Sequence, residues 1–290
     1  MSAQWTPSVM RTTKPKSSGI TLTSRAADLI KVGIMPFKNL RIEQRGDVAV
    51  LCLDRPPANA FDPEQVQAFE AALAHPTIAK ARALVLTASG EFFSAGLDLK
   101  AVPHLPKPEQ EEFLGGVNRA IAKLYSFPVP VVGAINGHAI GGGFILALST
   151  DYRIGPIGSA KFGMTEARVG VPFPAVPMVV VSSELPPQSV RYCAMYARKF
   201  GVEEAARHGV FDELLSPDEM LDRAVEVAED MASMPADSYR KVKHQVRGPA
   251  FRKIENVLST NSDPMLQSWL SPKARDASVA MLNGSVASQS

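Results

Sequence analysis

The sequence predicts an α/β fold in which short apolar strands alternate with helices. Three runs indicate strands, since each is short, rich in apolar residues and closed by polar or turn-forming residues: "DVAVLCLDR" (47–55), "RALVLTAS" (82–89) and "FPVPVVGAING" (127–137). The run at 82–89 is apolar almost throughout, as expected for a strand covered on both faces. Helical patterns stand between and after these runs, and such an alternation is typical of α/β units packed in layers.

The first predicted helix begins after Asp62, which supplies an N-cap, with Pro63 in the first turn and Gln65 as capping partner. Apolar residues then recur at helical spacing at Val66, Phe69 and Leu73. A buried helix is predicted at 143–149 and a short strand at 151–155. A capping box at Ser216, Pro217 and Glu219 starts a later helix, whose apolar face holds Leu221, Ala224, Val225, Ala228 and Met231. The last sixty residues are predicted to be mainly helical.

Composition excludes several classes of function. The chain has 290 residues and a formal net charge of +2, too near neutral to indicate nucleic-acid binding. Its two cysteines, Cys52 and Cys193, cannot form a disulfide scaffold, and the histidines and cysteines show no metal-ligand spacing. No apolar stretch has the length of a membrane span. We therefore expect no nucleic-acid partner, no membrane partner and no metal.

The two ends of the chain differ from its middle. Residues 1–36 are rich in Ser and Thr, and their charges are five cations and one acid, Asp28. This bias is typical of a mitochondrial targeting segment; the alternatives are a flexible leader or a true start at Met35. We expect a flexible leader at 1–36, a core at 37–230, a helical region at 231–285 and a disordered tail at 286–290. We expect the bacterial cytoplasm, with the mitochondrial matrix as the alternative should the leader be a transit peptide.

Two glycine-containing segments follow predicted strands. "EFFSAGLDLK" (91–100) follows the strand at 82–89, and "NGHAIGGG" (136–143) follows the strand at 127–135. If the two strands lie side by side, both glycine turns fall at one end of the sheet. Backbone N–H groups could then converge on one oxygen atom and stabilise negative charge on a carbonyl.

Other readings of these glycines are weaker. A dinucleotide fingerprint needs a third glycine where the chain has Leu146, and a phosphate-binding P-loop needs a Gly-Lys-Ser/Thr sequence that is absent. The remaining alternative is that the glycines only permit close packing of a helix against a strand.

Four motifs favour a binding role of the glycines over a packing role, because they occur in one order and at characteristic spacings: "FSAGLDLK" (93–100), "PVVGAINGHAIGGG" (130–143), "STDYRI" (149–154) and "AKFGMTEARVGV" (160–171). Together they resemble the crotonase (enoyl-CoA hydratase/isomerase) superfamily over roughly residues 38 to 285. The resemblance implies a spiral of ββα repeats with a helical C-terminal trimerisation region. It also implies an acyl-CoA thioester substrate, no separate cofactor because CoA is part of the substrate, and self-association to a homotrimer or a dimer of trimers.

The resemblance also implies roles for individual residues. The thioester oxygen would sit in an oxyanion hole made by the backbone amides of Leu97 and Gly142. The segment "RPPANAF" (55–61) matches the turn that contacts CoA in this family. The implied substrate- and CoA-binding residues are Arg55, Ala58, Ala60, Ala95, Asp98, Leu99, Gly141, Ile145, Thr165 and Pro174.

Two departures from the hydratases of this family indicate the reaction. Hydratases use two glutamates, and here the first position holds Ile145 whereas the second holds Glu166. Hydratases also hold water with a backbone N–H at the position of Pro174, which has none. One glutamate can still move a proton between two carbons, so the sequence predicts a 3,2-enoyl-CoA isomerase with Glu166 as proton shuttle. Dienoyl isomerases are disfavoured, because they carry an aspartate at the position of Ile145.

We expect Glu166 to lie in an apolar pocket formed by Phe162, Met164, Val169 and Phe173, where desolvation raises its pKa. The alternative is a surface salt bridge with Arg168.

Among the other candidates, His138 is interpreted as structural and Asp98 as an anchor of its loop. A second acid could enter from the segment around His104, Glu109, Glu111 and Glu112, which is interpreted as a solvated helix start. Four basic residues near the C-terminus are interpreted as a charged, solvated face of a helix, and the alternative is that they bind the phosphates of CoA: Lys241, Lys243, Arg247 and Lys253.

Two further functions stay open at this stage. The chain could hydrate, dehydrate or hydrolyse a specialised CoA ester with a second catalytic group from 103–112. It could also be a non-catalytic acyl-CoA-binding paralogue.

Overall fold

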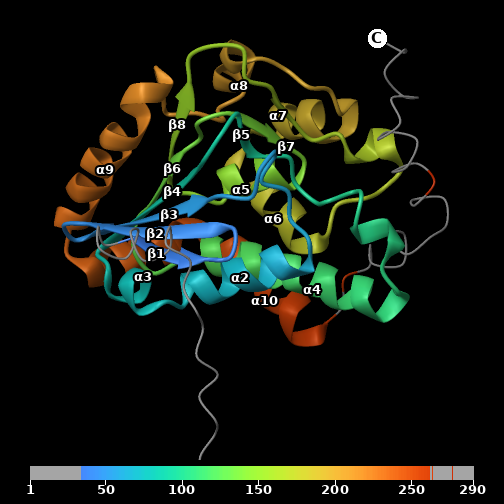
Figure 1. The fold of residues 1–290 in the computed structure, drawn as a ribbon, viewed down its shortest axis with the longest axis horizontal. Helices are drawn as coiled ribbons and strands as arrows, with labels where there is room; N and C mark the ends of the chain where they lie inside the picture. The colour runs from blue at the N-terminus through green and yellow to red at the C-terminus, as the bar shows by residue number, and fades with distance from the viewer. Residues whose placement is uncertain (1–33, 262, 264–275, 277–290) are drawn as a thin grey trace, which may run out of the picture.

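The computed structural model describes residues 34–261, 263 and 276, and it confirms a mixed α/β architecture (Figure 1). The large sheet has seven strands in the order β1-β2-β3-β4-β6-β8-β10. The pairs β1–β2 and β2–β3 are antiparallel and all later pairs are parallel. The strands are β1 (Ile34–Phe37), β2 (Leu40–Arg45), β3 (Val48–Leu53), β4 (Ala83–Ala88), β6 (Val131–Ala134), β8 (Tyr152–Pro156) and β10 (Glu213–Leu215).

A second, small sheet gives the fold its repeat. It consists of three parallel strands, β5 (Phe92–Ser94), β7 (His138–Ile140) and β9 (Phe162–Gly163). Each of β4, β6 and β8 in the large sheet is followed along the chain by one strand of the small sheet and then by a helix. Three ββα units thus succeed one another, which confirms the predicted spiral.

The helices follow the predicted starts where capping residues marked them. Asp62 caps the helix that begins at Pro63, because its side chain accepts a hydrogen bond of 2.8 Å from the backbone N–H of Gln65. Ser216 also stands at a helix start, but its hydroxyl contacts the Glu219 carboxylate instead of a backbone amide. The helices are α2 (Pro63–Leu73), α3 (Pro76–Lys80), α4 (Lys107–Tyr125), α5 (Gly142–Leu148), α6 (Ala175–Glu184), α7 (Pro187–Val190), α8 (Val202–Arg207), α9 (Pro217–Ser233) and α10 (Ala236–Thr260).

Three shorter turns of helix complete the described chain. Two are 3₁₀ turns, η1 (Val102–His104) and η2 (Glu166–Val169), and one is a π-helical turn, η3 (Arg191–Tyr196).

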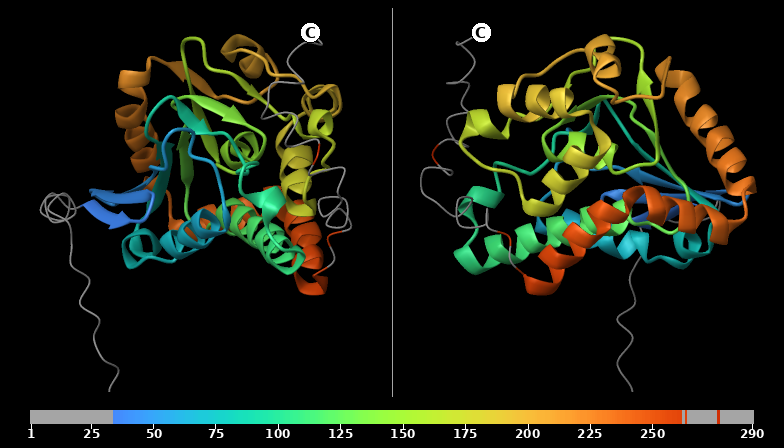
Figure 2. Two further views of the ribbon diagram at one scale, coloured as in Figure 1. Left: turned by 45° about the vertical axis from the view of Figure 1, so that its right-hand side comes forward. Right: turned by 180° about the vertical axis from the view of Figure 1, so that it is seen from behind.

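The large sheet is covered on both faces, as the apolar run at 82–89 predicts. One face packs on α9, with Val50 and Val85 of the strands against Met220 and Ala228 of the helix. Alternate residues of the same strands belong to the main core, which they share with α2, α4, α5 and α6. Figure 2 shows α9 on one side of the sheet and α2, α4 and α10 gathered on another. The site residues lie at the edge of this main core.

Helix α10 packs on α6 and α4, and a buried ionic cluster holds it in place. Asp151 accepts hydrogen bonds of 2.8 Å from Lys243 and 2.6 Å from Arg247, and Arg247 also contacts Glu184 at 3.0 Å. Both cations have less than a tenth of their side chains exposed. The prediction of a charged, solvated helical face is therefore wrong for Lys243 and Arg247, because these two side chains point into the protein.

None of the helices that the structure describes is long and apolar enough to cross a membrane. Residues 1–33 of the expected leader and the tail at 286–290 lie outside the described residues, so the expectations for them stay predictions, as does the division of the chain into four regions. Residues 34–36, expected in the leader, belong instead to β1 and pair with β2. The expected boundary at 230/231 falls in the last turn of α9, and the trimerisation role of the C-terminal region stays a prediction too.

Candidate active site

The two glycine segments meet, as the sequence predicts. Strands β4 and β6 pair in parallel, with Leu84 opposite Val131, and the short strands that follow them pair as well, with Phe92 opposite His138. The segments that leave β5 and β7 therefore run side by side. Gly96 belongs to the first, Gly142 to the second.

Contact between the segments is made by backbone atoms. A Cβ placed on Gly96 would lie 2.6 Å from the Gly142 nitrogen, and one placed on Gly142 would lie 3.7 Å from the Leu97 nitrogen. Gly96 also has a φ of +82°, which disfavours any side chain. A glycine is therefore required at 96, and the amides of Leu97 and Gly142 are neighbours.

Both amides are available to a ligand. Among the hydrogen bonds of the described residues, neither the Leu97 N–H nor the Gly142 N–H has a backbone or side-chain acceptor. The amides around Leu97 are used differently, since Phe61 donates to Gly96 at 2.7 Å and Asp98 donates to Phe61 at 2.8 Å. This pairing fixes the plane of the loop and leaves the Leu97 N–H unpaired. Two adjacent, unpaired donors have the arrangement that an oxyanion hole requires, so this position is a candidate oxyanion hole.

Glu166 lies beside this hole. Its Oε1 is 2.8 Å from the position that a Cβ on Gly141 would occupy, so the carboxylate stands over the α-carbon of that glycine. Its Oε2 is buried and has no hydrogen-bond partner in the described part of the chain. The residue is half-buried as a whole, but the carboxylate itself is desolvated.

Burial raises the pKa of Glu166 from 4.5 to about 8, and the backbone N–H groups of Glu166 and Thr165 offset part of that rise. Phe162, Met164 and Phe173, which the sequence predicts around this carboxylate, are all buried. The side chain of Val169, expected in the same pocket, lies outside the described part of the structure. A carboxylate whose pKa lies near neutrality can both accept and return a proton.

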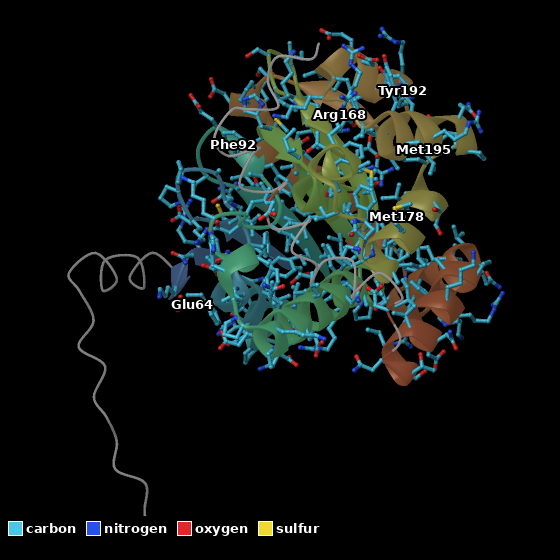
Figure 3. The ribbon with its side chains drawn as sticks, turned by 90° about the vertical axis from the view of Figure 1, so that its right-hand side faces the viewer. Glu64, Phe92, Arg168, Met178, Tyr192 and Met195 are labelled. Atoms are coloured by element: carbon cyan, nitrogen blue, oxygen red, sulfur yellow. The ribbon has the colours of Figure 1, made fainter. Side chains whose placement is uncertain are left out.

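Arg168 does not form the alternative salt bridge with Glu166. Its guanidinium donates to the carbonyls of Ala197 at 2.6 Å and Tyr196 at 3.1 Å, at the C-terminal end of η3. Figure 3 labels Arg168 together with Tyr192 and Met195 of η3. The 3₁₀ turn η2, which carries Glu166, is thereby tied to a neighbouring segment.

A small apolar cavity of about 40 Å³ adjoins the hole. Gly96, Leu97 and Gly142 line one part of it, and Phe61 together with side chains of α2, α4, α5 and α6 lines the rest. Ile145 is one of these, so the position where hydratases carry a glutamate contributes a hydrocarbon wall. No lining residue of this cavity has a charged or hydrogen-bonding side chain.

Residues of the expected CoA-binding turn hold the first loop. Ala58 accepts a hydrogen bond of 2.9 Å from the N–H of Ala95, and the Arg55 guanidinium donates to the carbonyl of Ala60 at 3.0 Å. Arg55 also pairs with Asp62 and, at 3.0 Å, with Asp98, so Asp98 does anchor its loop. CoA contacts for this turn stay predictions.

The other predicted binding residues differ in burial and in whether they line the cavity. Leu99 is half-buried directly after the first loop, and Thr165 precedes η2. Pro174 is buried and precedes α6; it does not line the cavity, whereas Pro177 of α6 does.

No second acid reaches the cavity from 103–112 within the described side chains. Glu109 and Glu112 are exposed, and Glu112 pairs with Arg119 at 2.8 Å. Glu111 faces Lys107 one helical turn away at 3.9 Å, and His104 is exposed. His138 accepts a hydrogen bond of 2.9 Å from the Lys161 N–H, which confirms a structural role.

Two residues of the site have no role in the sequence predictions. Asn59 is buried with a φ of +48°, and its amide donates to the carbonyls of Ser89 and Phe92. The Ser94 hydroxyl donates to Asn59 O and accepts from the Gly96 N–H at 3.1 Å. These hydrogen bonds hold the segment around Gly96 in place. An asparagine in a Pro- and Ala-rich turn is the sequence signal for such a left-handed position.

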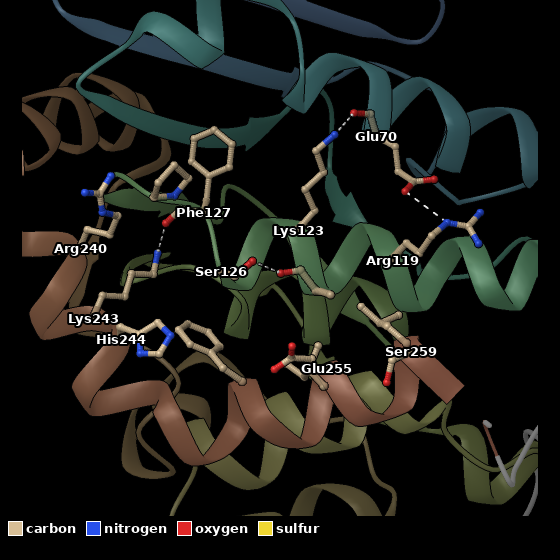
Figure 4. A pocket seen from close by; sticks show the side chains of 15 residues that line it. Glu70, Arg119, Lys123, Ser126, Phe127, Arg240, Lys243, His244, Glu255 and Ser259 are labelled. Atoms are coloured by element: carbon tan, nitrogen blue, oxygen red, sulfur yellow. Dashed lines mark hydrogen bonds and ion pairs between the residues drawn. The ribbon is translucent and has the colours of Figure 1, made fainter. Parts of the chain in front are cut away.

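A wider groove of about 770 Å³ lies between α4 and α10 (Figure 4) and shares no lining residue with the cavity. Lys123 and Ile254 are among its lining residues, and Lys123 donates to the Glu70 carbonyl at 2.8 Å. In the described residues no cluster of His, Cys, Asp and Glu has the geometry to hold a metal ion.

Comparisons with known proteins agree with this geometry. The sequence model of the family described as enoyl-CoA hydratase/isomerase matches residues 43–282. A protein of Escherichia coli (strain SMS-3-5) named carnitinyl-CoA dehydratase is 32% identical over 240 residues, which cover 80% of this chain and 91% of that protein.

Two solved structures share the fold. One is a probable enoyl-CoA hydratase, EchA3, of Mycobacterium tuberculosis, with a TM-score of 0.73 and 26% identity over 77% of this chain and 94% of that chain. The other is the human mitochondrial Δ3-Δ2-enoyl-CoA isomerase, with a TM-score of 0.76 and 21% identity over 87% of this chain and all of that chain (100%), a likeness that shows the fold alone. The family match over most of the chain and the dehydratase relative together place this chain in the enoyl-CoA hydratase/isomerase (crotonase) family of acyl-CoA enzymes.

Proposed function

We propose that this enzyme is a 3,2-enoyl-CoA isomerase, which moves a double bond from the β,γ to the α,β position of an acyl-CoA thioester. One observation carries the proposal. The desolvated carboxylate of Glu166, whose pKa is about 8, lies beside two unpaired backbone donors, while Ile145 adds only hydrocarbon to the adjoining cavity. One proton carrier and one oxyanion hole are what such a reaction requires.

In the first step the thioester oxygen accepts hydrogen bonds from the Leu97 and Gly142 amides. Glu166 removes a proton from C2, and the electrons of that C–H bond form the enolate, whose charge collects on the bound oxygen. In the second step the carbonyl reforms, the double bond shifts to C2–C3, and C4 takes the proton back from Glu166. The Glu166 carboxylate is regenerated, and the thioester bond to CoA stays intact throughout.

A second candidate is the dehydration of a 3-hydroxyacyl-CoA, which the name of the 32% identical relative favours. Glu166 would again take the C2 proton, and would then have to give it to the departing hydroxyl. In this route a single carboxyl group must act as the base at C2 and then as the acid that protonates the departing hydroxyl. In the hydratases that the four motifs resemble, a second glutamate shares this work, and Ile145 stands in its place.

The experiment that tests the proposal compares two CoA esters of equal chain length. Purified protein is mixed with 3-butenoyl-CoA and, separately, with 3-hydroxybutyryl-CoA, and formation of the conjugated 2-enoyl-CoA is followed by ultraviolet absorbance. We expect turnover of 3-butenoyl-CoA and its loss by at least about 10³-fold in Glu166→Gln, because the proton carrier is removed. Preferential turnover of the hydroxy ester would favour the dehydratase instead, and an undiminished rate in Glu166→Gln would refute the role of Glu166.

A further inference from the structure

We propose that Arg55 is a positioning residue for the oxyanion hole, and that its guanidinium holds the segment that presents the Leu97 N–H instead of binding a phosphate of CoA. The sequence resemblance implies a different role, because it counts Arg55 among the residues that bind the substrate or CoA. The inference rests on the proposed function in one respect, namely that a thioester oxygen binds between Leu97 and Gly142.

The Leu97 amide is oriented by a short pairing between two segments of the chain. Phe61 and Leu97 form an isolated parallel bridge. The Phe61 N–H donates to the Gly96 carbonyl at 2.7 Å, and the Asp98 N–H donates to the Phe61 carbonyl at 2.8 Å. These two hydrogen bonds lie on either side of Leu97 in the chain. The direction of the Leu97 N–H therefore depends on where Phe61 is held.

The Arg55 guanidinium fastens both sides of this bridge. Nη1 donates to the Ala60 carbonyl at 3.0 Å, and Nη2 donates to the carboxylates of Asp62 at 2.7 Å and Asp98 at 3.0 Å. Two of these acceptors are the chain neighbours of Phe61, and the third directly follows the oxyanion donor. A planar guanidinium can hold several acceptors in a fixed geometry, which an ammonium group on a flexible stem cannot do.

The charges around the Arg55 guanidinium disfavour a phosphate ligand. The Arg55 side chain is 24% exposed, and the side chains of Asp62 and Asp98 are 20% and 16% exposed. One guanidinium and two carboxylates leave this group with one net negative charge. A phosphate brought to it would be repelled, and would compete with both carboxylates for the N–H groups of the fork. The guanidinium is therefore better suited to holding the protein together than to holding CoA.

The test uses acetoacetyl-CoA, a 3-oxoacyl thioester that forms an enolate without being isomerised. This enolate carries its negative charge on the oxygen that the hole would bind, and it is followed by ultraviolet absorbance. The midpoint pH, at which half of the bound ester is enolate, measures how well the hole stabilises that charge. Arg55→Met should raise the midpoint pH by about one unit, a tenfold weaker preference for the enolate, because the Leu97 N–H loses its alignment.

A second ligand separates positioning from phosphate binding. Acetoacetyl-pantetheine carries the same thioester but none of the phosphates of CoA. Isothermal titration calorimetry gives the dissociation constants of both esters. If Arg55 positions the hole, Arg55→Met should change the two constants by the same factor, so that their ratio stays as it is in the unsubstituted protein.

Arg41→Met is the matched control. Arg41 pairs with Asp54 at 3.0 Å, its side chain is 36% exposed, and it also donates to Cys52, so its partners lie outside the bridge. Its loss should leave the midpoint pH unchanged, whatever stability thermal unfolding shows it to cost. Arg55→Lys keeps a cation that can bind a phosphate but not the planar fork. It should raise the midpoint pH in the same direction, which keeps the test decisive if Arg55→Met does not fold.

An unchanged midpoint pH in the Arg55 variants would overturn the positioning role, and so would an equal rise in Arg41→Met. Weaker binding of the CoA ester alone would show that Arg55 binds a phosphate. A midpoint no lower for the bound than for the free ester in the unsubstituted protein would mean that no hole forms, which also overturns the inference. The failure of the proposed function looks different: the midpoint would shift as expected, while 3-butenoyl-CoA would not be isomerised.

Discussion

The carboxylate of Glu166 occupies the space above the α-carbon of Gly141. Oε1 is 2.8 Å from the position of a Cβ at that residue, and the backbone there has a φ of +57°. Gly141 immediately precedes Gly142, so the carboxylate that η2 carries lies over the residue next to the proposed oxyanion donor.

The Gly141→Ala substitution should lower kcat by about 10²-fold or more, because the new methyl group displaces the carboxylate from the reacting carbon. Gly90→Ala is the matched control. Its φ of +79° imposes a similar backbone strain, but nothing lies within 4 Å of the added methyl. Steady-state kinetics with 3-butenoyl-CoA should therefore separate the two variants, while thermal unfolding should show comparable losses of stability. Equal losses of activity would show that strain and not displacement matters.

The activity should depend on pH through Glu166. The reaction starts from the carboxylate, and because the pKa is about 8 the group is mostly protonated at pH 6. Consequently kcat/KM should rise roughly tenfold per unit as the pH increases toward 8 and then level off. The measurement is a pH-rate profile from pH 5.5 to 9.5, a range chosen to bracket the expected transition at about 8. A plateau that already begins near pH 5 would show an unperturbed carboxyl.

Arg168 should act as a positioning residue for Glu166. It ties η2 to the carbonyls of Tyr196 and Ala197, so Arg168→Met should leave KM little changed and lower kcat about tenfold. The exposed Arg191 at the start of η3 supplies the control variant Arg191→Met. A structural role alone would lower the melting temperature without altering the pH-rate profile, whereas a shifted Glu166 should change the pH at which the profile levels off.

The buried cluster around Asp151 should stabilise the C-terminal helix. Asp151→Asn leaves Lys243 and Arg247 without their carboxylate partner, which should lower the free energy of unfolding by about 3–5 kcal/mol. Asp237→Asn on the exposed surface of the same helix removes two solvent-exposed ion pairs and should change stability little. Chemical denaturation of both variants gives the comparison. Similar midpoints for the two would mean that the cluster contributes no more than a surface pair.

The sequence was sufficient to predict the parts of the site that depend on local backbone requirements. Gly96 and Gly142 are needed where two loops touch, and their motifs have a fixed spacing that a single chain displays. Glu166 was indicated by the resemblance of its motif to the family, and the structure places its buried carboxylate over Gly141. The cap at Asp62 is a local signal as well.

Other features depend on contacts between distant segments. Strands β5, β7 and β9 have two or three residues each, too few to show an alternating pattern. Lys243 and Arg247 are buried because Asp151 lies 92 and 96 residues earlier in the chain, which no helical pattern reveals. Ile121 lies on a helix whose first turns are polar, so only the packing of α4 on α2 shows that it faces the cavity.

In the proposed reaction, negative charge is stabilised by main-chain atoms. The Leu97 and Gly142 N–H groups stand on segments that two strand pairings hold in place, and a peptide N–H is the same whatever side chain its residue carries. The proposed oxyanion hole therefore depends on the backbone path, which needs glycine at 96, and tolerates a change of the side chain at 97.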